Sequence, residues 1–180
     1  TNILKKQFET NFFGLYELTQ QALKIMRKQG YGRIIQHSSI LGIVSLRFRG
    51  AYNASKYAIE GMCDTLRLEL TDSDIFVSTI NTGPILSDFR KNATKMFKEH
   101  INIEESSFKK DYQTELLNNS TTKNSYFTKS SNVVIENIID ALESKKPKEK
   151  YYNTSATHLL SILKRILPTK ILDMILSKVK

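Results

Sequence analysis

Apolar residues recur at every third or fourth position along several stretches of the chain, which is the spacing of an amphipathic helix. Residues 2–29 and 51–71 carry the two longest of these patterns, and two glycines follow the first one closely. A shorter pattern covers 133–142, and the tail, 157–180, contains two apolar helical pieces separated by Pro168. We therefore expect two long helices and several shorter ones.

Short runs rich in β-branched residues alternate with these helices. Residues 33–38 and 75–80 predict two strands, 151–154 a third, and the Asn-Thr-Gly-Pro sequence at 81–84 a turn after the second. Between 85 and 130 the pattern loosens and helices are only weakly indicated. The alternation is typical of an α/β fold with a parallel sheet. Because a doubly wound sheet usually has about five strands or more, either the fold is small or its front half is missing from this chain.

The composition is that of an ordinary globular domain, with 180 residues, 40% of them hydrophobic and 25% charged. The single cysteine, Cys63, excludes a disulfide framework and a Cys-rich zinc site, and it is expected to be a small buried hydrophobe. Three scattered histidines (His37, His100 and His158) give no reason to expect a metal centre. No apolar run approaches the roughly 20 residues that span a bilayer, and no signal peptide is recognisable, so we expect a cytoplasmic protein.

Basic residues outnumber acidic ones by 27 to 18, which gives a formal charge of +9. No aromatic residues interleave the basic ones in the tail, and no helix-turn-helix or zinc-finger spacing appears, so nucleic acid is not an expected partner. The tail, 157–180, combines apolar helical faces with clustered lysines and arginines. Two interpretations stay open: the tail lies on an anionic membrane surface as a peripheral contact, or it packs on the sheet or on a partner subunit.

Tyr52 and Lys56 are four residues apart and therefore share one face of the second long helix. Alone, the pair is expected by chance and indicates an exposed helix pair. Three further features change this interpretation. Ser39 ends the first strand, and Asn11 lies in the first helix. The sequence Asn-Thr-Gly-Pro-Ile-Leu-Ser-Asp-Phe, residues 81–89, follows the second strand. Each feature has an ordinary structural explanation by itself, but their order along the chain is specific.

Together these features resemble the short-chain dehydrogenase/reductase family, strongly over residues 1–90 and weakly beyond. The stretch 163–168 in the tail looks like that of bacterial relatives of retinol and hydroxysteroid dehydrogenases. The resemblance implies a Rossmann-like doubly wound parallel sheet and an NAD(P)-dependent oxidoreductase that interconverts a carbonyl and an alcohol. The implied catalytic residues are Asn11, Ser39, Tyr52 and Lys56. The implied cofactor contacts are Tyr52, Lys56, Gly83, Pro84, Ile85 and Ser87, with NADP slightly favoured over NAD.

A carbonyl that accepts a hydride must also accept a proton, and a free tyrosine, with a pKa near 10, is a poor donor at neutral pH. An ammonium about 4 Å away, at an effective dielectric near 20, favours the phenolate by about 4 kcal/mol. That corresponds to roughly three pKa units, so Lys56 is expected to bring the pKa of Tyr52 near neutrality. By resemblance, Lys56 also binds the nicotinamide ribose, Ser39 holds the substrate oxygen, and Asn11 anchors a water.

The resemblance also implies how the chain is organised. Residues 1–156 form part of a catalytic domain, 85–130 contribute a substrate lid, and 157–180 form a separate helical tail. Apolar lid residues follow the turn; they either receive a small hydrophobic aldehyde, ketone or alcohol or pack the lid against the core. These residues are Ile85, Leu86, Phe89, Met96 and Phe97. In the family, helices equivalent to 2–29 and 51–71 often form subunit contacts, so a homodimer or homotetramer is expected.

The sequence departs from the family pattern in its glycines. None forms a Gly-rich turn after a strand, since Gly30 and Gly32 precede one, and Thr82 stands where the family commonly has proline. The N-terminal part of the nucleotide-binding half is therefore expected to be missing, and the chain alone to fold poorly and bind cofactor weakly. The alternative function is an inactive remnant or a non-enzymatic binding module. His37, beside the serines, is either a structural or a catalytic histidine.

Overall fold

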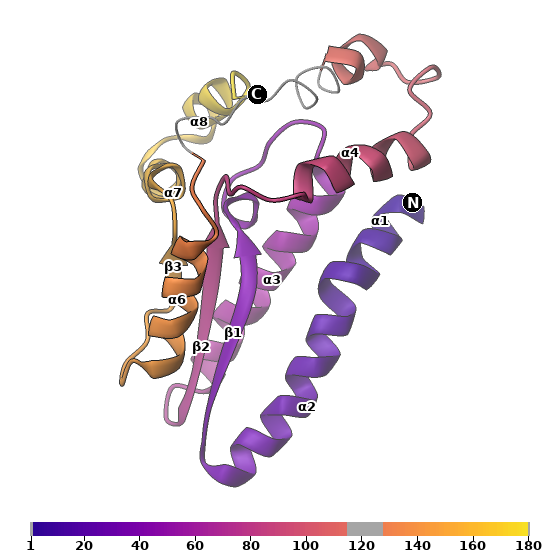
Figure 1. Cartoon of the computed structure of the whole chain (residues 1–180). Coiled ribbons are helices and arrows are strands. Elements are labelled where there is room, and N and C mark those ends of the chain that lie inside the picture. The colour runs from indigo at the N-terminus through magenta and orange to yellow at the C-terminus, as the bar shows by residue number, and fades with distance from the viewer. Residues whose placement is uncertain (1, 115–127, 180) are drawn as a thin grey trace.

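The computed structural model describes residues 2–114 and 128–179, and its centre is a parallel sheet (Figure 1). The strands are β1 (Tyr31–Ser39), β2 (Asp74–Thr82) and β3 (Lys150–Tyr152), in the order β1-β2-β3. In the register of β1 and β2, Ser39 lies opposite Thr82. The carboxyl ends of both strands therefore meet at one edge, which is where open α/β sheets bind ligands.

The first predicted helix, 2–29, is continuous but not uniformly α-helical. It consists of α1 (Asn2–Phe8), a π-helical turn η1 (Glu9–Phe13) and α2 (Gly14–Gln29). The helix ends at Gly30, whose φ of 82° is a left-handed conformation that glycine adopts without strain. The sequence predicted the helix and its end, but the apolar spacing gave no signal for the π-helical turn.

The second long helix, α3 (Gly50–Glu69), connects β1 to β2 and packs on one face of the sheet together with α2. Their shared core includes Ile34 of β1 and the fully buried Ile59 and Cys63 of α3. Burial raises the pKa of the Cys63 thiol to about 12, which confirms the prediction of a small buried hydrophobe.

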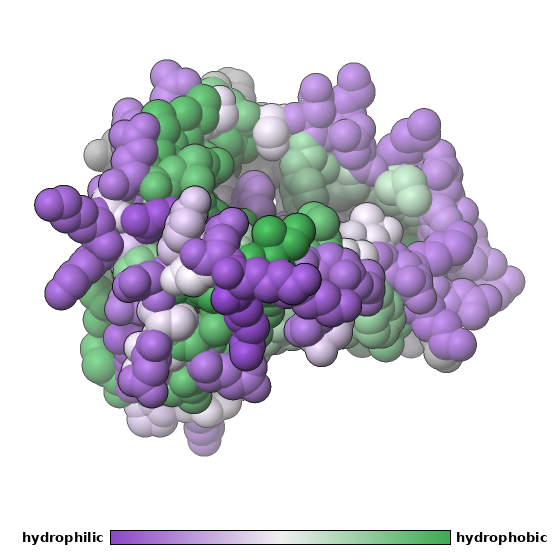
Figure 2. Space-filling model, turned by 90° about the horizontal axis from the view of Figure 1, so that it is seen from below, coloured by the Kyte–Doolittle hydropathy of each residue, from purple (hydrophilic) through white to green (hydrophobic). Residues whose placement is uncertain are grey.

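The opposite face of the sheet is covered by α6 (Asn132–Glu143). Ile35 of β1 packs toward this side while its neighbour Ile34 packs toward α3, because successive strand side chains point to opposite faces. The outer face of α6 carries exposed apolar side chains, and Figure 2 shows apolar residues gathered on the side of the molecule where Figure 1 places this helix. These residues are Ile135, Ile138, Ile139 and Leu142.

Two further parts of the chain surround the carboxyl edge of the sheet. One is α4 (Phe89–His100), which lies in the stretch where the sequence indicated helices only weakly. The other is the tail, where α7 (Ser155–Ile166) and α8 (Thr169–Leu176) flank Pro168 as predicted. Within the part of the chain that the structure describes, no helix is both long and apolar enough to cross a membrane.

Candidate active site

The end of β1 places Ser39 at the carboxyl edge of the sheet. Its hydroxyl accepts a hydrogen bond from the Leu41 N–H at 3.1 Å and lies 3.4 Å from the Thr82 carbonyl oxygen of β2. The side chain thereby caps the short 3₁₀ helix η2 (Ile40–Gly42), which turns the chain away from the strand. Ser39 is only 7% exposed, so this hydroxyl is held in a fixed place at the end of the sheet.

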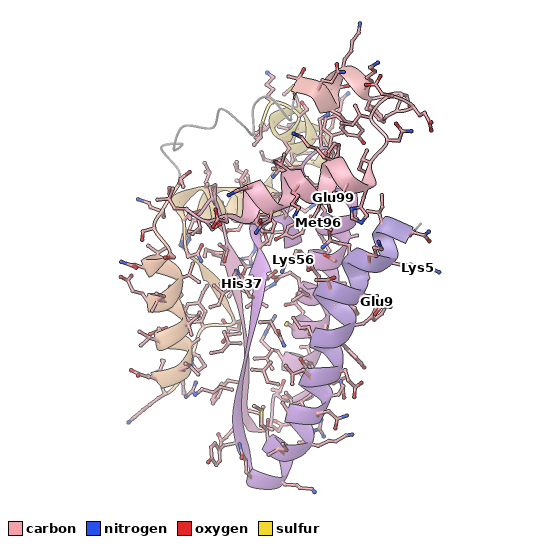
Figure 3. The ribbon with its side chains drawn as sticks, turned by 45° about the vertical axis from the view of Figure 1, so that its right-hand side comes forward. Lys5, Glu9, His37, Lys56, Met96 and Glu99 are labelled. Atoms are coloured by element: carbon pink, nitrogen blue, oxygen red, sulfur yellow. The ribbon has the colours of Figure 1, made fainter. Side chains whose placement is uncertain are left out.

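Tyr52 and Lys56 lie near the N-terminus of α3, facing the same edge of the sheet. The Lys56 ammonium donates a hydrogen bond of 2.9 Å to the His37 carbonyl oxygen of β1 and lies 5.7 Å from the centre of the Tyr52 ring. Figure 3 shows Lys56 and His37 close together beneath α4, with Met96 and Glu99 of that helix above them. The structure therefore brings Ser39, Tyr52 and Lys56 together.

Burial dominates the electrostatics of this pair. It raises the pKa of the Tyr52 phenol above its ordinary value, although a hydrogen bond with Ser39 and the positive charge of Arg49 oppose the shift. Burial also lowers the pKa of Lys56, and the negative charge of Glu60 partly restores it. The expectation that Lys56 brings the pKa of Tyr52 near neutrality is wrong for this structure. The physical reason is that desolvation of the phenolate outweighs the favourable contacts, while the ammonium is directed to the His37 carbonyl.

Asn11 contacts this pair indirectly. Its side-chain amide donates to the Ser55 hydroxyl at 3.0 Å, and that hydroxyl donates to the Tyr52 carbonyl oxygen at 2.8 Å. Ser55 is fully buried, so the two hydrogen bonds join the π-helical turn of the first helix to the turn of α3 that carries Tyr52 and Lys56. π-Helical turns are rare and often occur at functional sites.

The turn after β2 is held from two sides. The Gly83 N–H donates to the Asn153 side chain at 3.2 Å, and a Cβ at Gly83 would overlap the hydroxyls of Thr154 and Thr157 at the start of α7. The segment from Pro84 to Leu86 pairs with Lys129 through two backbone hydrogen bonds of 3.0 Å. The structure thus places Gly83, Pro84 and Ile85 in a fixed turn beside Thr82, and a contact with a cofactor stays a prediction.

Ser87 follows this turn, and its hydroxyl accepts a hydrogen bond of 3.4 Å from the Phe89 N–H at the start of α4. The Ser87 side chain is exposed, and its contact with a cofactor stays a prediction.

A buried polar network, which the sequence patterns did not predict, joins α3 to β2 and β3 next to the site. The Glu60 carboxylate accepts hydrogen bonds from the Asn81 amide of β2 at 2.6 Å and from the Lys150 ammonium of β3 at 2.7 Å. Burial lowers the pKa of Lys150, but its bonds to Glu60 and Asp64 outweigh this and raise it. The spacing offered one signal, since Glu60 follows Lys56 by four residues and lies on the same face of α3.

His37 has a structural contact of its own. Its Nε2 lies 2.8 Å from the Thr82 hydroxyl, across the pair of strands, while its carbonyl oxygen accepts from Lys56. Burial and the neighbouring positive charge of Lys56 lower the pKa of the imidazole, which favours the neutral ring. These contacts fit the structural interpretation of His37.

The comparisons with known proteins identify the family. The family model for short chain dehydrogenases matches residues 1–98, which is more than half of the chain. The chain therefore belongs to the short-chain dehydrogenase/reductase family of oxidoreductases, as the order of its motifs indicated. Among curated proteins, the uncharacterized oxidoreductase YbbO of Escherichia coli (strain K12) is 36% identical over 173 residues, which are 96% of this chain and 58% of that protein. The chain thus spans less than two thirds of the length of this relative.

Solved structures show the same fold. A short chain dehydrogenase from Burkholderia cenocepacia J2315 in complex with NADP has a TM-score of 0.69 at 18% identity, and the match covers 96% of this chain and 58% of that one. A short chain dehydrogenase/reductase from Burkholderia phymatum in complex with NAD has a TM-score of 0.67 at 16% identity, covering 87% and 55%. The prediction of a Rossmann-like α/β fold with a parallel sheet is confirmed.

Proposed function

We propose that the protein interconverts a hydrophobic aldehyde or ketone and the corresponding alcohol, with NADP or NAD as the hydride carrier. The observation that carries this proposal is the convergence of Ser39, Tyr52 and Lys56 at the carboxyl edge of the sheet. Two hydroxyls and one ammonium at this place suit the polarisation of a carbonyl oxygen.

Each residue has a distinct role in this proposal. A bound reduced nicotinamide supplies a hydride, with its electron pair, to the carbonyl carbon. Tyr52 donates its phenolic proton to the carbonyl oxygen, which becomes the alcohol, and Ser39 holds that oxygen by a hydrogen bond. The Tyr52 phenol is protonated at neutral pH and so carries the proton that the reduction consumes, although its raised pKa makes it a weaker proton donor than a free tyrosine.

Lys56 is the residue best placed to bind the cofactor ribose and to stabilise the phenolate after proton transfer. Asn11 is assigned a positioning role through Ser55, and the family's water-anchoring role for it is a further proposal. Gly83, Pro84, Ile85 and Ser87 are proposed to lie along the nicotinamide ring. The choice between NADP and NAD stays open, since the two solved relatives carry one each.

A hydrophobic substrate is supported by exposed apolar side chains on the lid. The ring of Phe89 lies 5.6 Å from the Tyr52 ring, and Leu86, Phe89 and Met96 are 52%, 56% and 51% exposed. Side chains that packed the lid against the core would be buried, so this exposure favours the substrate interpretation.

The test is the consumption of NADPH and NADH with straight-chain aldehydes of increasing length. Each methylene buried against the lid stabilises the bound aldehyde by about 0.8 kcal/mol at most, so kcat/KM should rise up to about fourfold per carbon. Phe89→Ala should flatten this dependence, whereas Tyr31→Ala, at an exposed position at the start of β1, should not. Binding of cofactor without turnover of any aldehyde or ketone would instead support the non-enzymatic alternative.

A further inference from the structure

A cavity of about 260 Å³ lies next to the N-terminus of α3, outside the group formed by Ser39, Tyr52 and Lys56. Three segments that are far apart in the sequence line it: the loop 46–49 before α3, residues 110–114 of the lid, and residues 177–179 after α8. The cavity is therefore formed by the tertiary fold and not by one local segment of the chain.

The lining of the cavity is strongly basic. Arg47, Arg49, Lys110 and Lys178 contribute positive charge, and Asp111 is the one acidic residue among the lining positions that the structure describes. Arg47 pairs with Asp111 at 3.3 Å, and Lys110 and Lys178 add two further positive charges to the described lining. The hydroxyls of Thr114 and Ser177 also line the cavity. Cationic groups beside hydroxyl donors are the usual partners of carboxylate and phosphate oxygens.

The wall of the cavity nearest the active site is held in place. The Asn53 side chain donates to the Leu46 carbonyl oxygen at 3.0 Å, and the Asn53 N–H donates to the Arg49 carbonyl oxygen at 2.8 Å. Phe48 has a φ of 61°, an uncommon conformation for a bulky residue. Its ring contacts those of Phe108 and Tyr112, with centres 5.7 and 5.1 Å away, and these contacts hold the loop against the lid.

The cavity is also close to the proton-donating residue. Arg49 contributes to its lining and precedes Tyr52 by three residues, and its positive charge acts on the Tyr52 phenol. Asn53, which anchors the loop, is the next residue after Tyr52. The lining therefore extends to within three residues of Tyr52 along the chain, and the charge of Arg49 is close enough to act on the phenol.

We propose that this cavity binds an anionic oxygen group, a carboxylate or a phosphate, beside the active site. Two sources have this chemistry: the far end of the carbonyl substrate, which would then be an oxo acid, or a free anion from solution. The substrate source rests on the proposed function, whereas the binding of a free anion does not.

The first arm of the test compares hexanal with the same aldehyde carrying a carboxylate at its other end. The enzyme is the protein encoded by the complete gene, in wild-type form and with the double substitution Lys110→Gln and Lys178→Gln. If the anion is part of the substrate, the KM for the oxo acid should rise about tenfold in the double variant, while kcat and the kinetics of hexanal stay unchanged. Lys24→Gln, at an exposed position on α2, is the matched control and should change neither substrate.

The second arm measures the binding of inorganic phosphate by calorimetry and needs no turnover. Binding that the double variant loses, without any preference for the oxo acid, would assign the cavity to a free anion. Equal kinetics for both aldehydes in every variant, together with no phosphate binding, would overturn the proposal. If neither aldehyde is turned over, the proposed function fails, and the calorimetric arm alone then decides whether the cavity binds an anion.

Discussion

At the scale of single residues, the side chains proposed to react are held by backbone groups as much as by one another. Ser39 caps η2 through the Leu41 N–H, and Lys56 donates to the His37 carbonyl oxygen. The carboxyl end of β1 therefore positions both side chains. The sequence motif selects these residues but contains no information about such contacts, so it could not predict the direction in which the pKa of Tyr52 is shifted.

Gly83 offers a test of how tightly the turn after β2 is packed. A methyl group at this position would overlap the hydroxyls of Thr154 and Thr157, so Gly83→Ala should lower the free energy of unfolding by about 1–3 kcal/mol. Gly61→Ala, at an exposed position of α3 with open space around it, should instead raise it by about 0.5–1 kcal/mol. Denaturant unfolding measures both, and equal effects would show that the packing around Gly83 is not limiting.

His37 gives the folded protein a pH dependence with a defined sign. Its pKa is lowered in the folded state, so between that value and the ordinary 6.5 the unfolded chain binds more protons. Its contribution to stability is present above pH 6.5 and is lost as the pH falls below it. The slope is less than the limit of about 1.4 kcal/mol per pH unit for one proton, because neighbouring atoms desolvate the ring while another part of the residue is exposed to solvent, which screens its charge.

The measurement is the free energy of unfolding from about pH 7 down to about pH 5, for wild type and for His37→Gln, which does not titrate in this range. The wild-type protein should lose more stability than the variant over this interval. Parallel profiles would show that the imidazole is not perturbed in the folded protein.

At the scale of the elements, the sequence predicted the regular helices and strands better than their irregularities. The strong apolar spacing of 2–29 and 51–71 located the first helix and α3 to within about two residues. The π-helical turn around Asn11 went unpredicted because the apolar spacing of the helix continues through it. Helix α4 was only weakly indicated because most of its residues are polar or charged, with Phe89, Met96 and Phe97 as its large apolar residues.

The helices of the tail are predicted to make a peripheral contact with a membrane surface. Leu159, Ile162 and Ile166 form one exposed apolar stripe on α7, and Lys164 and Arg165 lie beside it. This combination suits the surface of an anionic bilayer.

The protein should therefore float with vesicles that contain phosphatidylglycerol and less with neutral phosphatidylcholine vesicles. Replacing Ile162 and Ile166 by Glu should abolish flotation, whereas Tyr31→Glu, at an exposed position at the start of β1, should not. Equal flotation of all three proteins would contradict the membrane interpretation and leave the stripe as a surface for protein contacts.

At the scale of the whole molecule, the parallel sheet brings residues from distant parts of the chain to one edge. Asn11, Ser39 and Tyr52 come from different elements, and the packing of α3 against both β1 and η1 explains their proximity. The sequence predicted this edge through a family resemblance, since a single chain contains no direct record of long-range contacts. The basic cavity depends on three such segments, and no local pattern could have predicted it.

The outer faces of α2 and α3 are the predicted contact surfaces of an oligomer. Leu18 and Ile25 of α2 and Leu68 of α3 are 71%, 65% and 79% exposed, and they lie on the two helices that the family resemblance assigns to subunit contacts. Light scattering should give a dimer or tetramer, and replacing Leu18 and Ile25 by Lys should reduce its mass while circular dichroism stays unchanged. Leu142→Lys on α6 is the control for a contact through the other face, and a monomeric wild type would contradict the prediction.

We propose that Tyr52 transfers the proton that accompanies hydride transfer, and the substitution Tyr52→Phe removes the group that carries this proton. The variant retains the ring beside Phe89 and Lys56 and removes only the hydroxyl. In the protein encoded by the complete gene, we expect kcat for aldehyde reduction to fall by about 10²–10⁴, with the binding of reduced cofactor and the free energy of unfolding nearly unchanged. Tyr31→Phe, at an exposed position at the start of β1 and at the opposite end of the strand from Ser39, should retain full activity. Turnover by Tyr52→Phe at the wild-type rate would contradict the assignment of the site.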